Sequence, residues 1–485
     1  MNNKLEKARS YEREYLEGRT LETMEDRPLF HATGTVGWIN DPNGFSIYQG
    51  KYHLFYQYYP FDTHWGPMYW GHSVSKDLVK WEYLPCALAP DQGYDKDGCF
   101  SGSAIELEDG KQLLMYTGVL DGYQQQCIAI GDGIDYEKVS ENPVISTAMI
   151  PDGNDTHDFR DPKVIRQGDK FYCFAVNRNA DNSGQVFVYE SSDVINWSFN
   201  KTLDKCNNEL GVIWECPDYF QLQDKKVLIV SPQEVEGVEG GFYPGFNNFF
   251  LIGTGSDFLD FTREAVQQID FGPDFYAAQT LETPDGRRVL IAWMQNWETK
   301  DSGNELHDYF GMMTLVRELT IKEGHIYQNP VRELSNYYGK AISYEKVRVF
   351  DEQCIEGISG RAFDMTLEIE SENDCDYQFS VELAKGRGHK TVIAFDSANS
   401  SIRLDRTCSG ARYSALSTKE FKVELDGGRR LKMRIVLDKY AMELFVNDGR
   451  QAAAMKLDTP LKDDQISFNS SEPALVNITK HDFSF

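Results

Sequence analysis

Three acidic residues lie in short polar motifs whose chemistry could cleave a glycosidic bond. Asp41 lies in the stretch WINDPNG, Asp161 in RDP and Glu215 in WECPD. Enzymes that cleave glycosides use two carboxyl groups: one protonates the leaving oxygen, and the other attacks the sugar or activates water. A third carboxylate can hold vicinal sugar hydroxyls. Taken singly, each acid also fits a structural role, because Asp-Pro-Asn-Gly is common in turns and Arg-Asp neighbours commonly form ion pairs.

The elements that must position these acids are predicted from a repeat. Apolar, β-rich runs recur at Gly50, Gly110, Gly168, Lys225 and Gly286, with a period of about 60 residues. Each unit has room for about four short strands, which is the size of one propeller blade. We therefore predict an all-β protein with a five-bladed β-propeller over residues 26–335. An irregular sandwich with accidental spacing is the alternative.

Polar residues recur at nearly one phase of this repeat. Each unit carries one of them seven to ten residues before its hairpin, namely Asp41, Ser101, Asp161, Glu215 and Tyr276. The innermost strand of a blade lines the central channel, so residues at one phase should meet at one end of it. The common phase therefore predicts one site that gathers all three acids.

The segments on either side of the repeat predict further elements. Residues 1–25 are strongly charged and predict a helical extension that covers the propeller. Residues 349–485 alternate polar and apolar side chains and contain an Asn-Asp-Gly hairpin signal at 447–449, which predicts a β-sandwich. Residues 336–348 are the expected linker.

Charge and cysteine content exclude several classes of function. The chain has 49 Lys and Arg against 76 Asp and Glu, a net charge of −27, which disfavours nucleic acids and anionic membranes as partners. No apolar run is long enough to span a membrane. The nine cysteines are odd in number and form no CxxC pair, so we expect free thiols and no metal. With a charged N-terminal stretch that lacks an apolar core, this predicts a cytoplasmic protein.

Several motifs together resemble glycoside hydrolase family 32, the invertase and β-fructofuranosidase family. They occur in the family's order and cover most of residues 30–335, while MELFVNDG resembles the family's C-terminal sandwich. The motifs are WINDPNG at 38–44, WGPMYWGHSVSKDLVKW at 65–81, FSGSA at 100–104, RDP at 160–162, WECPD at 214–218, DFYAAQT at 274–280, RRVLIAWMQNW at 287–297 and GMMTLVREL at 311–319.

The resemblance implies a retaining hydrolase that releases terminal β-D-fructofuranosyl units from sucrose or sucrose 6-phosphate. It assigns Asp41 as the nucleophile, Glu215 as the acid/base and Asp161 as the group that holds the fructose 3- and 4-hydroxyls. It implies no metal and no cofactor. The family's fructose pocket maps onto Asn40, Gln57, Trp65, Phe100, Ser101 and Arg160, with weaker matches at Tyr276 and Trp293.

The mechanism requires Asp41 to be ionised and Glu215 to be protonated at the start of the reaction. The polar stretch around Asp41, and the flanking Trp214 and Cys216 of Glu215, are expected to favour these states, with Cys216 tuning the surroundings of the acid.

Alternatives to this reading remain open. An exo-acting hydrolase of short fructo-oligosaccharides of inulin or levan type, a fructosyltransferase and a non-catalytic sugar-binding propeller are the other functions considered. A phosphorylated substrate would need a basic outer subsite, for which no residue is assigned among His64, His72, Lys96 and His157. The sequence indicates no oligomeric state.

Overall fold

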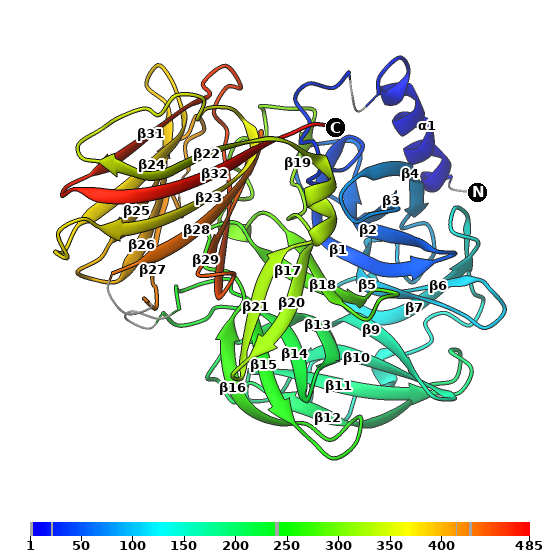
Figure 1. Cartoon of the computed structure of the whole chain (residues 1–485). Coiled ribbons are helices and arrows are strands. Elements are labelled where there is room, and N and C mark those ends of the chain that lie inside the picture. The colour runs from blue at the N-terminus through cyan, green and yellow to red at the C-terminus, as the bar shows by residue number, and fades with distance from the viewer. Residues whose placement is uncertain (1–2, 21–22, 238–241, 414, 426–428) are drawn as a thin grey trace.

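The computed structural model describes residues 3–20, 23–237, 242–413, 415–425 and 429–485. Five sheets of four or five strands form a β-propeller, and two further sheets form a β-sandwich beside it (Figure 1). The predicted all-β architecture is thereby confirmed. Among the described residues, no helix combines the length and the apolarity that a membrane crossing requires.

Each blade has four antiparallel strands, which are consecutive in the chain except in blade V. The blade I strands are β1 (Gly37–Tyr48), β2 (Lys51–Tyr59), β3 (Tyr69–Ser75) and β4 (Trp81–Leu88). The blade II strands are β5 (Gly98–Glu106), β6 (Gln112–Leu120), β7 (Tyr123–Gly131) and β8 (Tyr136–Lys138). The blade III strands are β9 (Phe159–Gln167), β10 (Lys170–Arg178), β11 (Gly184–Ser191) and β12 (Ser198–Lys205).

Blades IV and V complete the ring. The blade IV strands are β13 (Ile213–Leu222), β14 (Lys225–Gln233), β15 (Phe249–Thr254) and β16 (Thr262–Gln268). The blade V strands are β17 (Tyr276–Glu282), β18 (Arg288–Trp293), β20 (Arg317–Lys322) and β21 (His325–Pro330). Between β18 and β20 the chain crosses to blade I, where β19 (Tyr309–Phe310) pairs in parallel with the start of β1. This pairing joins the last blade to the first.

All five inner strands are irregular at the level of the predicted site. Their register against the second strand of the blade shifts after Ile39, Phe100, Arg160, Glu215 and Tyr276. Three non-glycine residues at this level, Asp161, Cys216 and Ala277, have positive φ angles of 59°, 50° and 57°. Bulges redirect side chains locally, and here they occur where the chain turns polar groups toward the channel.

The sandwich has a six-stranded and a five-stranded sheet. The first consists of β22 (Tyr338–Val349), β32 (Ala474–Phe483), β23 (Ala362–Ser371), β28 (Leu431–Asp438), β29 (Ala441–Val446) and β30 (Gln451–Lys456). The second consists of β27 (Thr418–Lys422), β26 (Ser401–Cys408), β25 (Lys390–Asp396), β24 (Gln378–Lys385) and β31 (Gln465–Ser470). Apolar side chains from both sheets form one core between them.

The region expected as a linker, 336–348, differs from that expectation. A short 3-10 helix (Arg332–Tyr337) leads directly into β22, which pairs along most of its length with β32. β22 is an edge strand with largely exposed side chains, so its polar sequence resembles a connection although its backbone belongs to the sheet.

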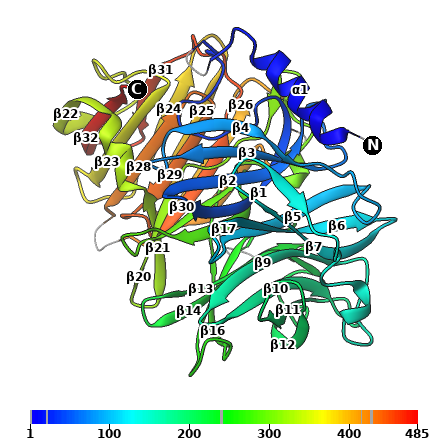
Figure 2. The ribbon, with the colours of Figure 1, turned by 90° about the vertical axis from the view of Figure 1, so that its right-hand side faces the viewer.

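Helix α1 (Lys4–Leu16) packs along the outer edge of blade I, next to β4 (Figure 2). Arg9 Nε donates to the Cys86 carbonyl at 2.9 Å, and Glu12 accepts the Cys86 backbone N–H at 2.9 Å. The amphipathic N-terminal segment therefore covers the outermost strand of this blade, which would otherwise be an open edge.

Candidate active site

Asp41 lies on β1, the innermost strand of blade I. Its Oδ2 accepts a hydrogen bond from Ser101 Oγ of blade II at 2.6 Å, and its Oδ1 accepts one from Asn40 Nδ2 at 3.1 Å. Asn40 is oriented in turn by Trp38 Nε1, which donates to its Oδ1 at 2.8 Å. Two neighbouring blades thus fix the orientation of this carboxyl group.

Asp161 lies on β9 of blade III, at one of the positions with positive φ. Its backbone N–H donates to Thr117 Oγ1 at 3.0 Å, and its Oδ2 accepts the backbone N–H of Cys216 at 3.0 Å. The Cys216 thiol lies 3.6 Å from both Asp161 Oδ2 and Asp41 Oδ2. One cysteine therefore bridges two of the predicted acids.

Glu215 lies on β13 of blade IV and is contacted by an arginine and a tyrosine. Arg160 donates to Glu215 Oε1 from Nε at 3.1 Å and from its terminal nitrogen at 3.0 Å. The Tyr276 hydroxyl donates to Glu215 Oε2 at 2.6 Å, which connects blade V to the site. The five residues predicted from their common phase are thus joined through direct contacts or through Arg160 and Cys216.

The electrostatics of Asp41 differ from the sequence expectation. Burial, followed by the like charge of Glu215, raises the pKa of Asp41 to about 6 despite its three hydrogen-bond donors. The expectation treated WINDPNG as a polar turn, whereas the structure places it in a strand in which every residue of the motif except the partly exposed Asp41 is buried. Glu215, expected among apolar neighbours, instead faces the guanidinium of Arg160.

Burial and the nearby carboxyl groups also shift the pKa values of Asp161 and Cys216. Burial raises the pKa of Asp161 to about 7; Arg160 opposes that shift, and Glu215 and Asp41 add to it. Burial, followed by the charges of Asp161 and Asp41, raises the pKa of the Cys216 thiol well above its usual value. The thiol therefore remains protonated, and its single S–H is a weak donor within reach of either carboxylate.

Aromatic side chains form the apolar wall of the site. Trp38 stacks on Phe310 with ring centres 5.1 Å apart, and Trp293 is fully buried against Trp38. Trp65 is 47% exposed and meets Phe100 edge to face at 6.2 Å. Trp65 is thus presented to solvent as a platform on which a sugar could stack, whereas Trp293 supports the wall from behind.

Gln57 lies one layer behind the carboxylates. It is buried on β2 and donates from Nε2 to the Cys99 carbonyl at 2.9 Å, just before Phe100. The structure therefore gives Gln57 a contact that orients the backbone next to Phe100 and Ser101.

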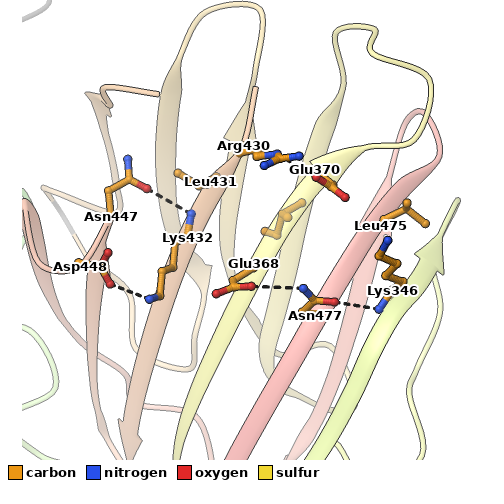
Figure 3. Close-up of a pocket in the computed structure, with 11 residues that line it drawn as sticks. Lys346, Glu368, Glu370, Arg430, Leu431, Lys432, Asn447, Asp448, Leu475 and Asn477 are labelled. Atoms are coloured by element: carbon orange, nitrogen blue, oxygen red, sulfur yellow. Dashed lines mark hydrogen bonds and ion pairs between the residues drawn. The ribbon is translucent and has the colours of Figure 1, made fainter. Parts of the chain in front are cut away.

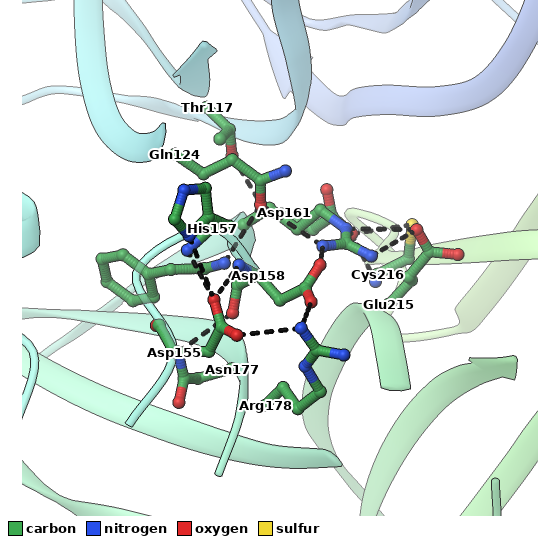
Figure 4. A network of polar contacts seen from close by, with 12 residues as sticks. Thr117, Gln124, Asp155, His157, Asp158, Asp161, Asn177, Arg178, Glu215 and Cys216 are labelled. Carbon is green, nitrogen blue, oxygen red and sulfur yellow. Dashed lines mark hydrogen bonds and ion pairs between the residues drawn. The ribbon is translucent and has the colours of Figure 1, made fainter. Parts of the chain in front are cut away.

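Some residues that support the site were absent from the sequence prediction. Arg160 is held by Asp158, which accepts from it at 2.7 Å, and by Gln124, which accepts at 3.3 Å. Asp158 in turn pairs with Arg178 at 2.8 Å (Figure 4). Gln124 and Thr117 lie on β7 and β6, outside the inner strands, so the phase of the repeat could not reveal them.

A second concave region, on the sandwich, differs from this site in how its charged side chains are paired and exposed. A hollow of about 590 Å³ lies on the outer face of the six-stranded sheet (Figure 3). Two of its three bases are paired with acids, Lys432 with Asp448 at 2.7 Å and Arg430 with Glu370 at 2.9 Å. These pairs lie at the protein surface, whereas the carboxylates of the propeller are withdrawn from water and crowded together. Within the described part of the chain, no group of three or more His, Cys, Asp or Glu residues is arranged to hold a metal ion.

A five-bladed propeller that gathers three acids and an exposed tryptophan at its channel has the parts of a carbohydrate-cleaving enzyme. Residues 31–330 match the family described as "Glycosyl hydrolases family 32 N-terminal domain", and residues 333–477 match "Glycosyl hydrolases family 32 C terminal". The chain belongs to glycosyl hydrolase family 32.

Individual relatives agree with this assignment. A sucrose-6-phosphate hydrolase of Zymomonas mobilis is 36% identical over 456 residues, covering 89% of this chain and 86% of that protein. A raffinose invertase of Escherichia coli is 31% identical over 443 residues and covers 89% of each chain. The structure of a Bombyx mori GH32 beta-fructofuranosidase superposes with a TM-score of 0.84 at 29% identity, covering 99% of this chain and 98% of the other.

Proposed function

We propose that this protein is a retaining β-fructofuranosidase that releases terminal β-D-fructofuranosyl units from sucrose or sucrose 6-phosphate. The observation that carries the proposal is the meeting of Asp41, Asp161 and Glu215, from three blades, around Arg160 and Cys216. The names of the family relatives support the substrate class, since they include sucrose-6-phosphate hydrolases and a raffinose invertase.

In the proposed first step, an Asp41 oxygen attacks the anomeric C2 of fructose while Glu215 gives its proton to the glycosidic oxygen. The bond from C2 to that oxygen breaks, the glucose portion leaves, and a fructosyl ester of Asp41 remains. In the second step Glu215 takes a proton from water, the resulting hydroxide attacks C2, and the Asp41 carboxylate is released. Glu215 then carries the proton taken from water, which restores the starting protonation of the enzyme.

The hydrogen bonds of Asp41 support its role in this division. Burial and the like charge of Glu215 raise the pKa of Asp41, whereas Ser101 and Asn40 donate to its carboxyl group and favour the ionised form that attacks the sugar. Asp161, buried beside Arg160, is placed to accept hydrogen bonds from two fructose hydroxyls.

The four bases considered for a phosphate group give no built phosphate subsite. His64 and Lys96 are half-exposed and pair with Asp62 at 2.8 Å and Asp121 at 3.1 Å. His157 is likewise exposed and lies 3.7 Å from Asp155. His72 is fully buried on β3, so it cannot meet a ligand in a surface loop as expected.

An exo-acting hydrolase of short fructo-oligosaccharides is the second candidate. It is favoured by a levanase of Bacillus subtilis that is 33% identical over 457 residues. A fructosyltransferase would share the covalent intermediate and differ only in the acceptor that resolves it. A non-catalytic sugar-binding propeller is disfavoured because such a protein has no need of a nucleophile and an acid together.

The deciding experiment measures kcat/KM on sucrose, sucrose 6-phosphate and 1-kestose side by side, with Asp41→Asn as the inactive control. We expect hydrolysis of sucrose or its 6-phosphate with release of fructose. Higher activity on 1-kestose would replace the proposal with the exo-fructosidase. Absence of turnover on all three substrates would refute both.

We also propose a cytoplasmic location. It is supported by the nine cysteines, all of which are free thiols and six of which are buried in the folded protein. Thiol labelling of each fraction of the source cells, followed by detection of this chain, tests the location; recovery of the protein outside the cytoplasm would refute it.

A further inference from the structure

A buried ion pair joins the β-sandwich to the segment that leads into β17 of the propeller. Arg406 of β26 forms a bidentate pair with Asp274, and both side chains are fully buried. Arg406 also lies 3.6 Å over the ring of Tyr413 and donates from Nε to the Leu416 carbonyl at 3.2 Å. The Arg406 guanidinium is therefore fixed by contacts on several sides, so it can hold the Asp274 carboxylate in one position.

The segment of blade V that carries Asp274 is bound to the sandwich along its whole length. Phe271 N–H donates to Ala452 O at 2.8 Å and Asp274 N–H to Ala454 O at 3.2 Å, while Asp274 Oδ2 accepts Lys456 N–H at 2.7 Å. Residues 271–274 thus run beside β30 almost as an added strand.

A lysine from the sandwich strengthens the same attachment. Lys419 of β27 is buried and donates to Gly272 O at 2.8 Å. At Gly272 a Cβ atom would come within 2.0 Å of the Ala454 carbonyl oxygen, so only glycine allows this approach. The segment is therefore fitted to the sandwich and has little freedom of its own.

Two residues after Asp274 comes Tyr276, whose hydroxyl oxygen lies 2.6 Å from Glu215 Oε2 and 3.0 Å from the Ser231 carbonyl oxygen; its single proton makes the shorter of these contacts, to Glu215. β17 is the innermost strand of its sheet and pairs only with β18, and its register shifts directly after Tyr276. We propose that Arg406 is a positioning residue for glycoside cleavage: by pairing with Asp274 it sets the start of β17 and so holds the Tyr276 hydroxyl on Glu215. This inference rests on the proposed acid/base role of Glu215, and it gives the sandwich a part in the reaction.

The test compares Arg406→Met/Asp274→Asn with the wild-type enzyme. The double variant removes both charges together, because leaving one buried charge without its partner strongly destabilises a protein. We expect kcat on sucrose to fall by about tenfold, the factor that corresponds to one hydrogen bond to a charged group, with KM changed by less than about twofold. On an aryl fructoside with a good leaving group the fall should be smaller, since little proton transfer is needed.

A double-mutant cycle with Tyr276→Phe distinguishes a positioning role of Arg406 from a role in stability alone. If Arg406 acts through Tyr276, adding the Arg406 and Asp274 changes to Tyr276→Phe should cause no further fall in kcat. Arg406→Lys, which retains the charge but not the two-pronged contact, should recover part of the activity. The matched control is Arg434→Met/Asp364→Asn, a pair at 2.7 Å within the sandwich that should change the melting temperature and leave kcat unaltered.

Three results would overturn the inference: wild-type kcat in the folded double variant, a fall that multiplies with that of Tyr276→Phe, or an equal fall in the Arg434 control. If the double variant does not fold, Arg406→Lys replaces it in the same cycle with Tyr276→Phe, and the same three results would overturn the inference. If the wild-type enzyme hydrolyses no fructoside, the proposed function itself has failed, which is a distinct outcome.

Discussion

Removal of the Ser101 hydroxyl should shift the pH dependence of the reaction. Ser101 Oγ donates to Asp41 Oδ2 at 2.6 Å, and this bond favours the ionised carboxylate that must attack the sugar. A hydrogen bond to a charged group contributes about 1.5–3 kcal/mol, and one pKa unit corresponds to ~1.4 kcal/mol. In Ser101→Ala the acidic limb of kcat/KM should therefore move upward by about one to two pH units.

The size of the effect at neutral pH follows from the pKa of Asp41. With a pKa of about 6, about 90% of Asp41 is ionised at pH 7. A rise of one to two units leaves about one half to one tenth ionised, so kcat/KM at pH 7 should fall by about two- to tenfold. Near pH 9 the ratio of variant to wild type should return almost to one, because Asp41 is then ionised in both proteins.

The assay is a pH–rate profile on the best fructoside substrate, with Ser103→Ala as the matched control. Ser103 lies on the same strand, but its hydroxyl donates to the Pro162 carbonyl at 2.7 Å and accepts the Val164 N–H, without contact to Asp41. Asp161 can contribute to the same limb, yet Ser101 does not bond to it, so only the Asp41 component should move. An acidic limb that superimposes on the wild type, with activity lowered equally at every pH, would refute the reasoning.

Three further predictions address other parts of the molecule. Asp41→Asn should lower kcat by ~10⁴-fold or more with an unchanged circular dichroism spectrum, as expected for loss of the covalent step; near-normal turnover would end the nucleophile assignment. Glu215→Gln should lose much less activity on an activated aryl fructoside than on sucrose, because a good leaving group needs little protonation; equal losses would contradict its role as the acid. Burial alone would lower the pKa of His31, but its contacts with Asp438 and Glu443 raise it to about 9. That raised pKa stabilises the folded state by about 3 kcal/mol below about pH 6.5, and the stabilisation disappears as the pH rises toward 9. The melting temperature of His31→Gln should therefore differ most from that of the wild type at acidic pH. A difference in melting temperature that does not change with pH would refute the linkage.

The repeat could be predicted from the sequence because its signals are local. The hairpin anchors Gly50, Gly110, Gly168 and Gly286 lie in the turn between the first and second strands of their blades, and Lys225 begins the second strand of blade IV. Since the inner strand always precedes that turn, counting backward from it finds the residues that reach the channel. The same counting gives no information on the outer strands, where Thr117 and Gln124 lie.

The partners of the acids could not be predicted, because they depend on bulges. Arg160 and Asp161 are neighbours in sequence, yet Arg160 lies 3.0 Å from Glu215 and 3.9 Å from Asp161. The positive φ of Asp161 turns the two side chains in different directions, so Arg160 serves the acid of the next blade. In the same way, the environment of Asp41 depends on burial by blades far away in the sequence, which composition cannot reveal.

The crossing from blade V back to blade I has a consequence for synthesis of the chain. Phe310 stacks on Trp38, which orients Asn40 beside Asp41. The surroundings of Asp41, which is synthesised early, therefore depend on Phe310, which is synthesised much later. At a ribosomal rate of ~5–20 residues per second, roughly 15 to 50 s separate the emergence of Asp41 from that of Phe310. For that interval the first inner strand has an open edge with apolar neighbours, which is the kind of surface that chaperones bind. Nascent chains that stop before residue 310 should therefore be the species most prone to aggregate.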